Sequence, residues 1–277
     1  MKRLLLSMLF LALIMTTVSG TASAKSNHMS EKELNKFLLN AGTPQEILES
    51  MDLDTKEFIY NNSSDGEVNY GAKNTNFFSV DPQTNKLTKV VEPDGMMSAK
   101  AYISSSDLKL TLYQFNVTSG GVSYKDIYAE YNWIDYTGMG GNTGVDKDHI
   151  AIAVPDGWEI QSGQYACANQ WKADYSGATW SAPNSSACNN GNPGEYSLYG
   201  AGWQFTGPKI DSVFHKGTVK LRMRKQDSDA INRVVVLYSE ANSSAFGYSV
   251  GFTWGPASVS ITPNTGSNNT GSTDLSW

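Results

Sequence analysis

Three aromatic residues in the segment 158–205 are the first candidates for binding chemistry. Trp171, Tyr175 and Trp180 lie between Cys167 and Cys188, which are the two cysteines of the chain. Exposed aromatic rings can stack on sugar faces, while neighbouring Asn and Asp side chains bind the hydroxyl groups. We therefore predict that these three residues bind a glycan, with filling of the core as the alternative role of such rings.

The two cysteines are predicted to pair with each other. In an oxidising compartment this is the simplest outcome for two thiols. A Cys167–Cys188 bond would add about 3 kcal/mol by restricting the unfolded chain. A cysteine nucleophile would instead need an unpaired thiol close to a histidine. A zinc site is disfavoured, because no C-x-x-C or H-x-x-x-H spacing accompanies the pair.

Two Asp-x-Asp sequences raise the question of calcium. Calcium binds six to eight oxygen atoms, and two carboxylates in one loop can face the same ion. Asp146 and Asp148 follow a glycine-rich stretch and are the preferred candidate ligands; Asp227 and Asp229 form the second sequence. Aspartate is also a common turn residue, which is the alternative explanation. No other cofactor is predicted.

No catalytic residue can be identified from the sequence. Residues 247–251 match the G-x-S-x-G pattern, but that motif needs a strand, a sharp turn and a helix, with a histidine later in the chain. The last histidine is His215, so we predict Ser249 to be an outward-facing strand residue. The glycine-rich stretch 138–144 lacks the spacing of a phosphate-binding loop. A glycosidase takes its two carboxylates from distant strands, and nothing local selects two of the 27 acidic residues.

Alternating apolar residues from about residue 67 predict the elements that must position these side chains. A period of two is typical of strands, and turn sequences separate about ten of them. Clear examples are 108–112, 127–133, 219–223 and 246–261. We therefore predict a mainly β fold, an antiparallel β-sandwich over residues 67–262, with a single closed sheet as the alternative.

A basic stripe accompanies the strand at 219–223. It consists of Lys220, Arg222, Arg224 and Lys225. We predict that these side chains are solvated and discourage pairing of strand edges. The alternative is contact with an anionic wall polymer.

Residues 25–66 differ from the rest and are predicted to form a short helical N-terminal segment and linker. Ser30 and Glu33 fit a capping box, and Thr43 with Pro44 predicts the start of a second helix. A third short turn is expected at 58–60, followed by a linker at 61–66. This segment is too small to hold a core, so it must dock on the next domain, act as a pro-segment, or stay partly mobile.

The two ends of the chain predict its location. Lys2 and Arg3, an apolar run from Leu4 to Met15, and small residues at 22–24 fit a signal peptide over residues 1–24. The run is too short to cross a bilayer, and no later segment has 18 consecutive apolar residues. We therefore predict a secreted, extracellular protein. The tail 263–277 is rich in Asn, Gly, Ser and Thr and is predicted to be disordered.

Charge limits the partners. Two of the 21 basic residues and none of the 27 acidic residues lie in the predicted signal peptide, so the remaining chain has a net charge of about −8. A nucleic acid or an anionic membrane would need a strongly basic surface, so neither is predicted as a partner.

Two stretches resemble a known group of proteins. The stretch Leu39 to Asn62, with its Gly-Thr-Pro-Gln-Glu-Ile pattern, and the stretch Ala151 to Trp158 are similar to uncharacterised secreted proteins of Bacillus-like Gram-positive bacteria. The resemblance implies a bacterial origin and brings no catalytic residues with it.

These observations predict a non-enzymatic extracellular binding or surface-associated module, with a cell-wall or environmental glycan as its partner. One alternative is a secreted carbohydrate-active hydrolase with dispersed carboxylates, which would need a cleft with two carboxyl groups about 5–9 Å apart. Another is a membrane-active, toxin-like protein, although the net charge and the lack of a long apolar hairpin argue against it. The sequence does not define the oligomeric state.

Overall fold

The computed structural model describes residues 29–63, 66–81, 83–84, 86–90, 107–135, 147–206, 213–241, 248–253, 255–263 and 268–277. The predicted signal peptide, the glycine-rich stretch 138–144 and Asp146 lie outside these residues. Within the described part of the chain, no helix is long and apolar enough to cross a membrane.

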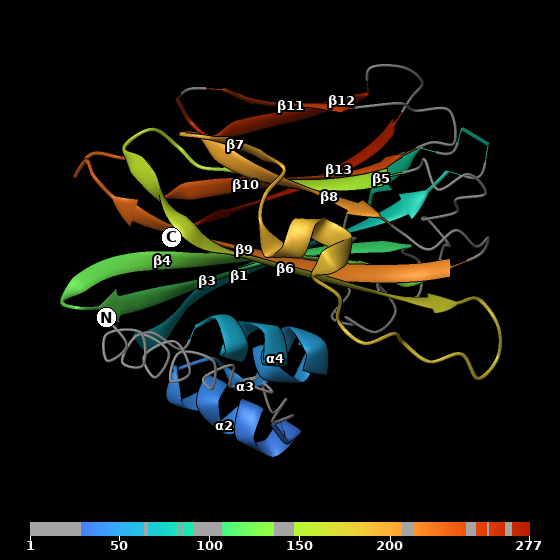
Figure 1. Cartoon of the computed structure of the whole chain (residues 1–277), viewed down its shortest axis with the longest axis horizontal. Coiled ribbons are helices and arrows are strands. Elements are labelled where there is room, and N and C mark those ends of the chain that lie inside the picture. The colour runs from blue at the N-terminus through green and yellow to red at the C-terminus, as the bar shows by residue number, and fades with distance from the viewer. Residues whose placement is uncertain are drawn as a thin grey trace, which may run out of the picture. The chain divides into compact units, whose positions relative to one another are not determined.

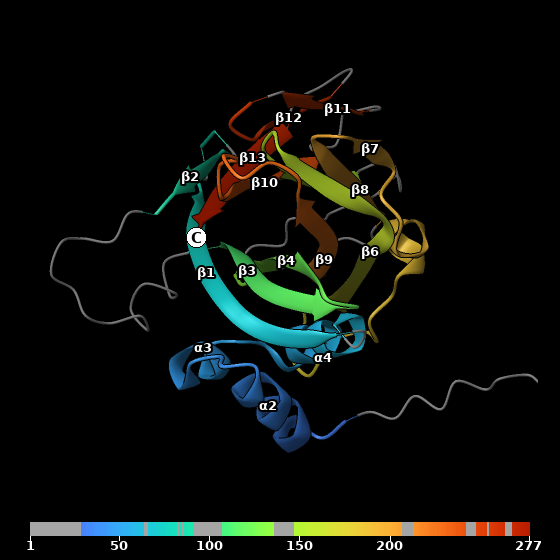
Figure 2. The ribbon, with the colours of Figure 1, turned by 90° about the vertical axis from the view of Figure 1, so that its left-hand side faces the viewer.

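Two antiparallel sheets face each other and confirm the predicted sandwich (Figures 1 and 2). The larger sheet has the order β2 (Leu87–Lys89), β1 (Glu67–Val80), β3 (Leu108–Ser119), β4 (Val122–Trp133), β9 (Val213–Lys225), β6 (Trp158–Ala173). The smaller sheet has the order β13 (Asn268–Ser276), β10 (Arg233–Ala241), β5 (Lys147–Ala153), β8 (Gly200–Thr206), β7 (Glu195–Ser197). A separate hairpin consists of β11 (Tyr248–Thr253) and β12 (Ser258–Pro263).

Alternation along the strands divides the apolar side chains between two cores. In β3, Leu108, Leu110 and Leu112 enter the core between the sheets. The odd-numbered positions Tyr113, Phe115 and Val117 enter a second core on the outer face of the larger sheet. Because successive strand residues point to opposite faces, one strand serves both cores.

Three helices cover this outer face (Figure 2). They are α2 (Glu31–Asn40), α3 (Gln45–Glu49) and α4 (Leu53–Asn62). Leu38, Leu48 and Ile59 bury their side chains in the second core, so the helical segment docks on the β domain. Helix α3 begins one residue later than predicted, with Pro44 at its N-cap. Helix α4 has ten residues where a short turn and the start of a linker were predicted.

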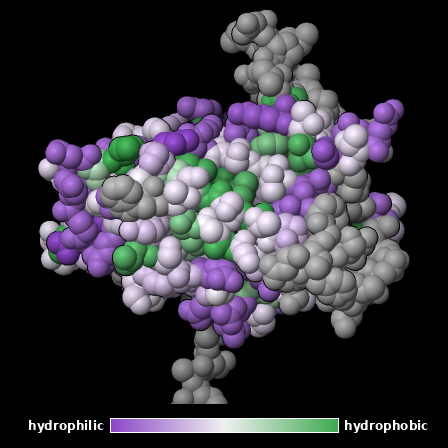
Figure 3. Space-filling view, turned by 90° about the horizontal axis from the view of Figure 1, so that it is seen from above, coloured by the Kyte–Doolittle hydropathy of each residue, from purple (hydrophilic) through white to green (hydrophobic). Residues whose placement is uncertain are grey.

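The outer face of the smaller sheet is covered by the β11–β12 hairpin. Phe252 lies so close to Gly200 that an added Cβ at that glycine would come within 2.1 Å of the ring. Ser249 is exposed on β11, as predicted. Seen from this side, hydrophobic surface gathers near the middle of the face and hydrophilic residues surround it (Figure 3).

The prediction of a disordered tail is wrong for residues 268–276. These residues form β13, which pairs with β10 from Arg233↔Ser276 to Ala241↔Asn268. Asn269, Gly271, Thr273 and Leu275 are the buried positions of this strand. In addition, the side-chain amides of Asn74 and Asn76 on β1 donate to the carbonyls of Asp274 and Ser272, at 2.6 and 3.0 Å. Backbone and amide hydrogen bonds therefore hold a segment whose polar composition is typical of disorder.

The prediction of a solvated basic stripe is wrong for Lys220 and Arg222. Each is only 3% exposed, because helix α4 and the side chains around it cover the outer face of β9. Lys220 Nζ donates to the carbonyl of Asn62 at the end of α4, at 2.9 Å. Arg224 is exposed, as predicted, and Lys225 is partly buried.

Candidate binding site

The predicted disulfide is present and holds one edge of the larger sheet. Cys167 on β6 is bonded to Cys188 in the 3-10 helix η1 (Ser186–Gly191). The enclosed loop also returns to β6 through its backbone. Ser181 N donates to the carbonyl of Trp171 at 2.8 Å, and a bridge joins Asn169 to Asn184.

The three predicted glycan-binding residues lie on this loop and strand but do not form one flat surface. Trp171 is 37% exposed. In the register of β6 and β9 it lies opposite the buried His215, so its side chain is on the inner face of β6. Trp180 lies on the outer side, with Lys172 Nζ and Lys216 Nζ at 5.2 and 4.7 Å from its ring centroid. Tyr175 is 70% exposed in the turn after β6. A binding role for these residues therefore stays a prediction.

The predicted calcium ligands are not seen together. Asp148 lies inside strand β5 rather than in a turn, and it is 1% exposed. Its carboxylate accepts a hydrogen bond from the hydroxyl of Tyr238. The part of the chain that the structure describes contains no cluster of three or more His, Cys, Asp or Glu side chains able to hold a metal ion. Asp146 lies outside that part, so the pairing of the two aspartates is not tested.

Asp148 instead belongs to a polar cluster within the core between the sheets. His215 Nε2 lies 3.4 Å from Asp148 Oδ2, and Trp133 Nε1 donates to the Tyr238 hydroxyl at 2.8 Å. Burial lowers the pKa of His215 to about 3, so the imidazole is neutral. The histidine is completely buried, which closes it to substrate in this conformation. Catalytic residues are thus not identified in this cluster.

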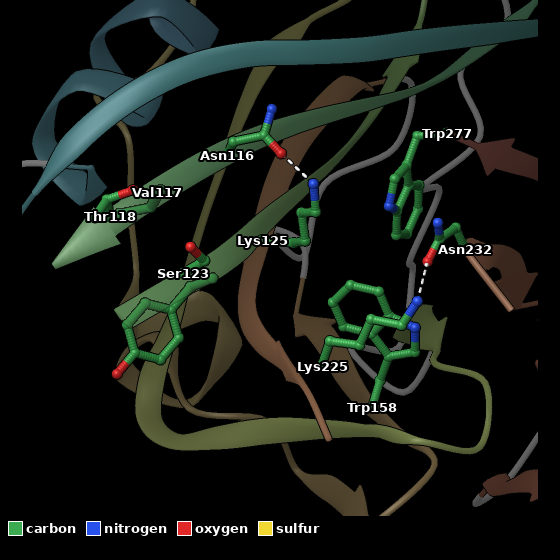
Figure 4. A pocket seen from close by; sticks show the side chains of 10 residues that line it. Asn116, Val117, Thr118, Ser123, Lys125, Trp158, Lys225, Asn232 and Trp277 are labelled. Atoms are coloured by element: carbon green, nitrogen blue, oxygen red, sulfur yellow. Dashed lines mark hydrogen bonds between the residues drawn. The ribbon is translucent and has the colours of Figure 1, made fainter. Parts of the chain in front are cut away.

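A pocket that the sequence did not reveal opens between the two sheets at one end of the sandwich. It has a volume of about 350 Å³. The ends of β3, β4, β6 and β9, the residue before β10 and the residue after β13 surround it (Figure 4). Its lining is Asn116, Val117, Thr118, Ser123, Tyr124, Lys125, Trp158, Lys225, Asn232 and Trp277.

Two tryptophans form a corner in this pocket. The ring centroids of Trp158 and Trp277 are 5.8 Å apart, and their planes cross at 76°. Trp158 is fixed by its indole N–H, which donates to the carbonyl of Ile231 at 3.0 Å. Trp277 is fixed through its backbone N–H, which donates to the carbonyl of Asn232 at 3.2 Å. The indole nitrogen of Trp277 is buried and has no hydrogen-bond partner.

Two lysines lie against the tryptophans. Lys125 Nζ is 5.9 Å from the ring centroid of Trp277, and Lys225 Nζ is 5.8 Å from that of Trp158. Each ammonium also donates to the side-chain carbonyl of an asparagine: Lys125 to Asn116 Oδ1, and Lys225 to Asn232 Oδ1 at 3.3 Å (Figure 4). Distances near 6 Å from an aromatic centroid are typical of cation–π contacts, so each ammonium group is attracted to the ring beside it.

The pocket was missed because its parts are far apart in the sequence. Lys125 and Lys225 come from β4 and β9, and Trp277 comes from the tail that was predicted to be disordered. The one local signal was Trp158, which follows the turn at Pro155–Gly157.

No protein-family model and no curated protein sequence matches the chain. Among similar solved structures is the collagen-binding domain from a Staphylococcus aureus adhesin, with 4% identity, a TM-score of 0.28, and coverage of 55% of this chain and 88% of that one. A structure concerned with Streptococcus parasanguinis adhesion by Fap1 fimbriae has 11% identity, a TM-score of 0.32, and coverage of 74% and 95%. A pore-forming protein has 10% identity, a TM-score of 0.29, and coverage of 72% and 96%. Because function belongs to sites rather than to folds, we derive it from the pocket of this chain.

Proposed function

We propose that this chain is a non-enzymatic, extracellular or surface-associated binding module of bacterial origin, and that its ligand is a cell-wall or environmental glycan. The observation that carries the proposal is the corner of Trp158 and Trp277 in the pocket between the sheets. A pyranose ring presents an apolar C–H face and a rim of hydroxyl groups. The partly exposed ring of Trp277 can stack on that face, while Trp158, which is only 6% exposed, supports Trp277 from the side.

The polar lining suits the same ligand. Asn116 and Asn232 carry side-chain amide N–H groups that can donate to sugar hydroxyls. Small-molecule sites are commonly lined by aromatic side chains together with a small number of polar groups. A single sugar residue with its substituents matches a pocket of about 350 Å³.

Two features support an extracellular location. The predicted signal peptide over residues 1–24 would direct the chain out of the cytoplasm. The Cys167–Cys188 disulfide is typical of an oxidising compartment.

The pocket favours binding over hydrolysis. Its ten lining residues include no Asp or Glu, whereas a glycosidase places two carboxyl groups beside the scissile bond. Asp148 and Glu240 lie close enough to interact, but both are almost fully buried in the core. For a membrane-active protein, release of dye from liposomes would be the deciding observation.

Co-sedimentation tests the proposal. Purified protein that begins at Lys25 is mixed with Gram-positive cell walls, cellulose, chitin or anionic liposomes, and the pelleted fraction is measured. We expect selective pelleting with one glycan, loss of pelleting in Trp277→Ala, and retention in Trp171→Ala and Trp180→Ala.

The variants are one another's controls, because they separate the pocket from the surface predicted from the sequence. Loss of pelleting only in the Trp171 and Trp180 variants would move the site to the disulfide loop. If no glycan pellets the protein, the binding-module proposal fails.

A further inference from the structure

The pocket holds two cations in a chain that is acidic as a whole. The sequence has a net charge of −6, yet the lining of the pocket contains two lysines and no acidic side chain. Among the residues that the structure describes, the partners of these ammonium groups are neutral: the side-chain carbonyls of the asparagines and the tryptophan rings. Since an ammonium group has three N–H donors, each lysine keeps donors for a ligand.

The two lysines also act on each other. Burial, and after it the positive charge of Lys225, lowers the pKa of Lys125. Mutual repulsion in a partly buried site is unfavourable, and an anion between the two ammonium groups would relieve it. Both lysines are partly buried and lie on the inner sides of their strands. In the strand register, Lys125 lies opposite Met223 of the core, and Lys225 lies opposite the buried Trp158.

We infer that the sugar bound at the Trp158–Trp277 corner carries an anionic substituent, a carboxylate or a phosphate, which Lys125 and Lys225 hold together. This inference rests on the proposed function and adds the charge of the ligand to it. The sugar ring lies against the indoles, and its charged group points to β4 and β9, from which the two lysines extend. Asn116 and Asn232 orient the ammonium groups by accepting one N–H each.

Calorimetric titration with matched ligands tests the inference. The probes are trimers of galacturonate, glucuronate and mannuronate, the neutral methyl ester of each trimer, glucose 6-phosphate, and glucose. Inorganic phosphate and acetate report whether an anion binds without a sugar. We expect at least one anionic sugar to bind about tenfold more tightly than its neutral counterpart at low salt, the factor that a modest charge interaction gives.

Charge-matched variants show where the preference arises. The double variant Lys125→Gln/Lys225→Gln should lose the preference for the anionic sugar while thermal unfolding shows that it is folded. The control Lys32→Gln/Lys36→Gln removes the same charge from the exposed face of helix α2 and should keep the preference. Added salt should weaken binding of the anionic sugar in wild type and control and leave the double variant unaffected.

The outcomes separate the inference from the proposed function. Equal binding of a uronate trimer and its methyl ester, or a preference that survives in the double variant, overturns the inference and leaves a neutral-glycan module. Binding of phosphate or acetate as tight as that of the anionic sugars overturns the role of the sugar ring. If none of these saccharides binds, the inference fails, and co-sedimentation with cell walls, cellulose and chitin decides the glycan proposal separately.

Discussion

Asp126 illustrates how single residues decide what lies under the helices. Its carboxylate accepts two hydrogen bonds from the guanidinium of Arg222, at 2.6 and 2.9 Å. Lys220 Nζ lies 3.3 Å from the same carboxylate, and all three residues are at most 3% exposed. Two buried cations therefore share this buried anion, and the backbone carbonyl of Asn62 provides Lys220 with a further acceptor.

Replacement of Asp126 by Ala should strongly lower the free energy of unfolding. Removing one partner of a buried pair leaves uncompensated charge and costs about 3–5 kcal/mol. The control is Asp274→Ala, whose partner Arg233 lies 3.0 Å away but whose side chains are 48% and 37% exposed. The exposed pair should cost less than about 1 kcal/mol. Urea unfolding of both variants measures the difference, and equal losses would show that Asp126 is not a structural anion.

At the scale of elements, the helices and the outer face of the larger sheet stabilise each other. Ile59 on α4 is completely buried, and Tyr113, Phe115 and Tyr128 form the sheet side of the same core. Polar contacts add to this: Asn132 donates to Asp52 at 3.0 Å, and Lys216 Nζ lies 2.5 Å from Asp54. The helices therefore cover aromatic side chains that would otherwise meet water.

Ile59→Ala should destabilise the whole domain by about 2–5 kcal/mol, the usual cost of deleting a fully buried aliphatic side chain. The matched control Leu39→Ala removes an aliphatic side chain that is 47% exposed on α2, and it should change stability by less than about 1 kcal/mol. Thermal or urea unfolding, monitored by the tryptophans of the sheets, measures both. If Ile59→Ala leaves the midpoint unchanged, the helical segment behaves as a dispensable pro-segment.

At the scale of the whole molecule, the core between the sheets contains ionisable groups that make stability depend on pH. Burial, with the charge of Asp148, raises the pKa of Glu240 on β10 to about 8. The folded chain thus keeps a proton on Glu240 that the unfolded chain releases near pH 4.5. The stability that this proton brings is full below pH 4.5 and is lost as the pH rises through 8. His215 acts in the opposite direction, because its stabilising contribution is lost as the pH falls from 6.5 through 3.

Between pH 6.5 and 8, Glu240 still titrates differently in the folded and unfolded states, whereas His215 no longer does. We expect the free energy of unfolding to fall in this range by about 1.4 kcal/mol per pH unit from Glu240. Glu240→Gln should remove this fall, while the exposed control Glu195→Gln should keep it. Urea unfolding at pH 6.5, 7.25 and 8 provides the comparison. An identical pH dependence in wild type and Glu240→Gln would show that Glu240 is not buried as a neutral acid.

Much of the fold was predictable because its signals are local. The alternation in β3, β4 and β9 predicted strands with an apolar face, and Ser30 predicted the start of α2. The pairing of Cys167 with Cys188 followed from there being two cysteines in the chain. Polar composition, by contrast, misled the prediction for β13, because a strand held by β10 and by the amides of β1 needs few apolar residues.

The sequence by itself determined the alternation of the strands, the helical N-terminal segment and the disulfide, while secretion stays a prediction. Tertiary structure alone decided that α4 buries Lys220 and Arg222, and that Trp171 and Trp180 lie on opposite sides of β6. It also brought Lys125, Trp158, Lys225 and Trp277 together into one pocket. The physical reason is that the hydrophobic period of a segment and the caps of a helix depend on residues a few positions away. Which face of a strand meets water or a helix depends on segments far away in the sequence; Lys220 on β9, for example, is covered by the end of α4, 158 residues earlier.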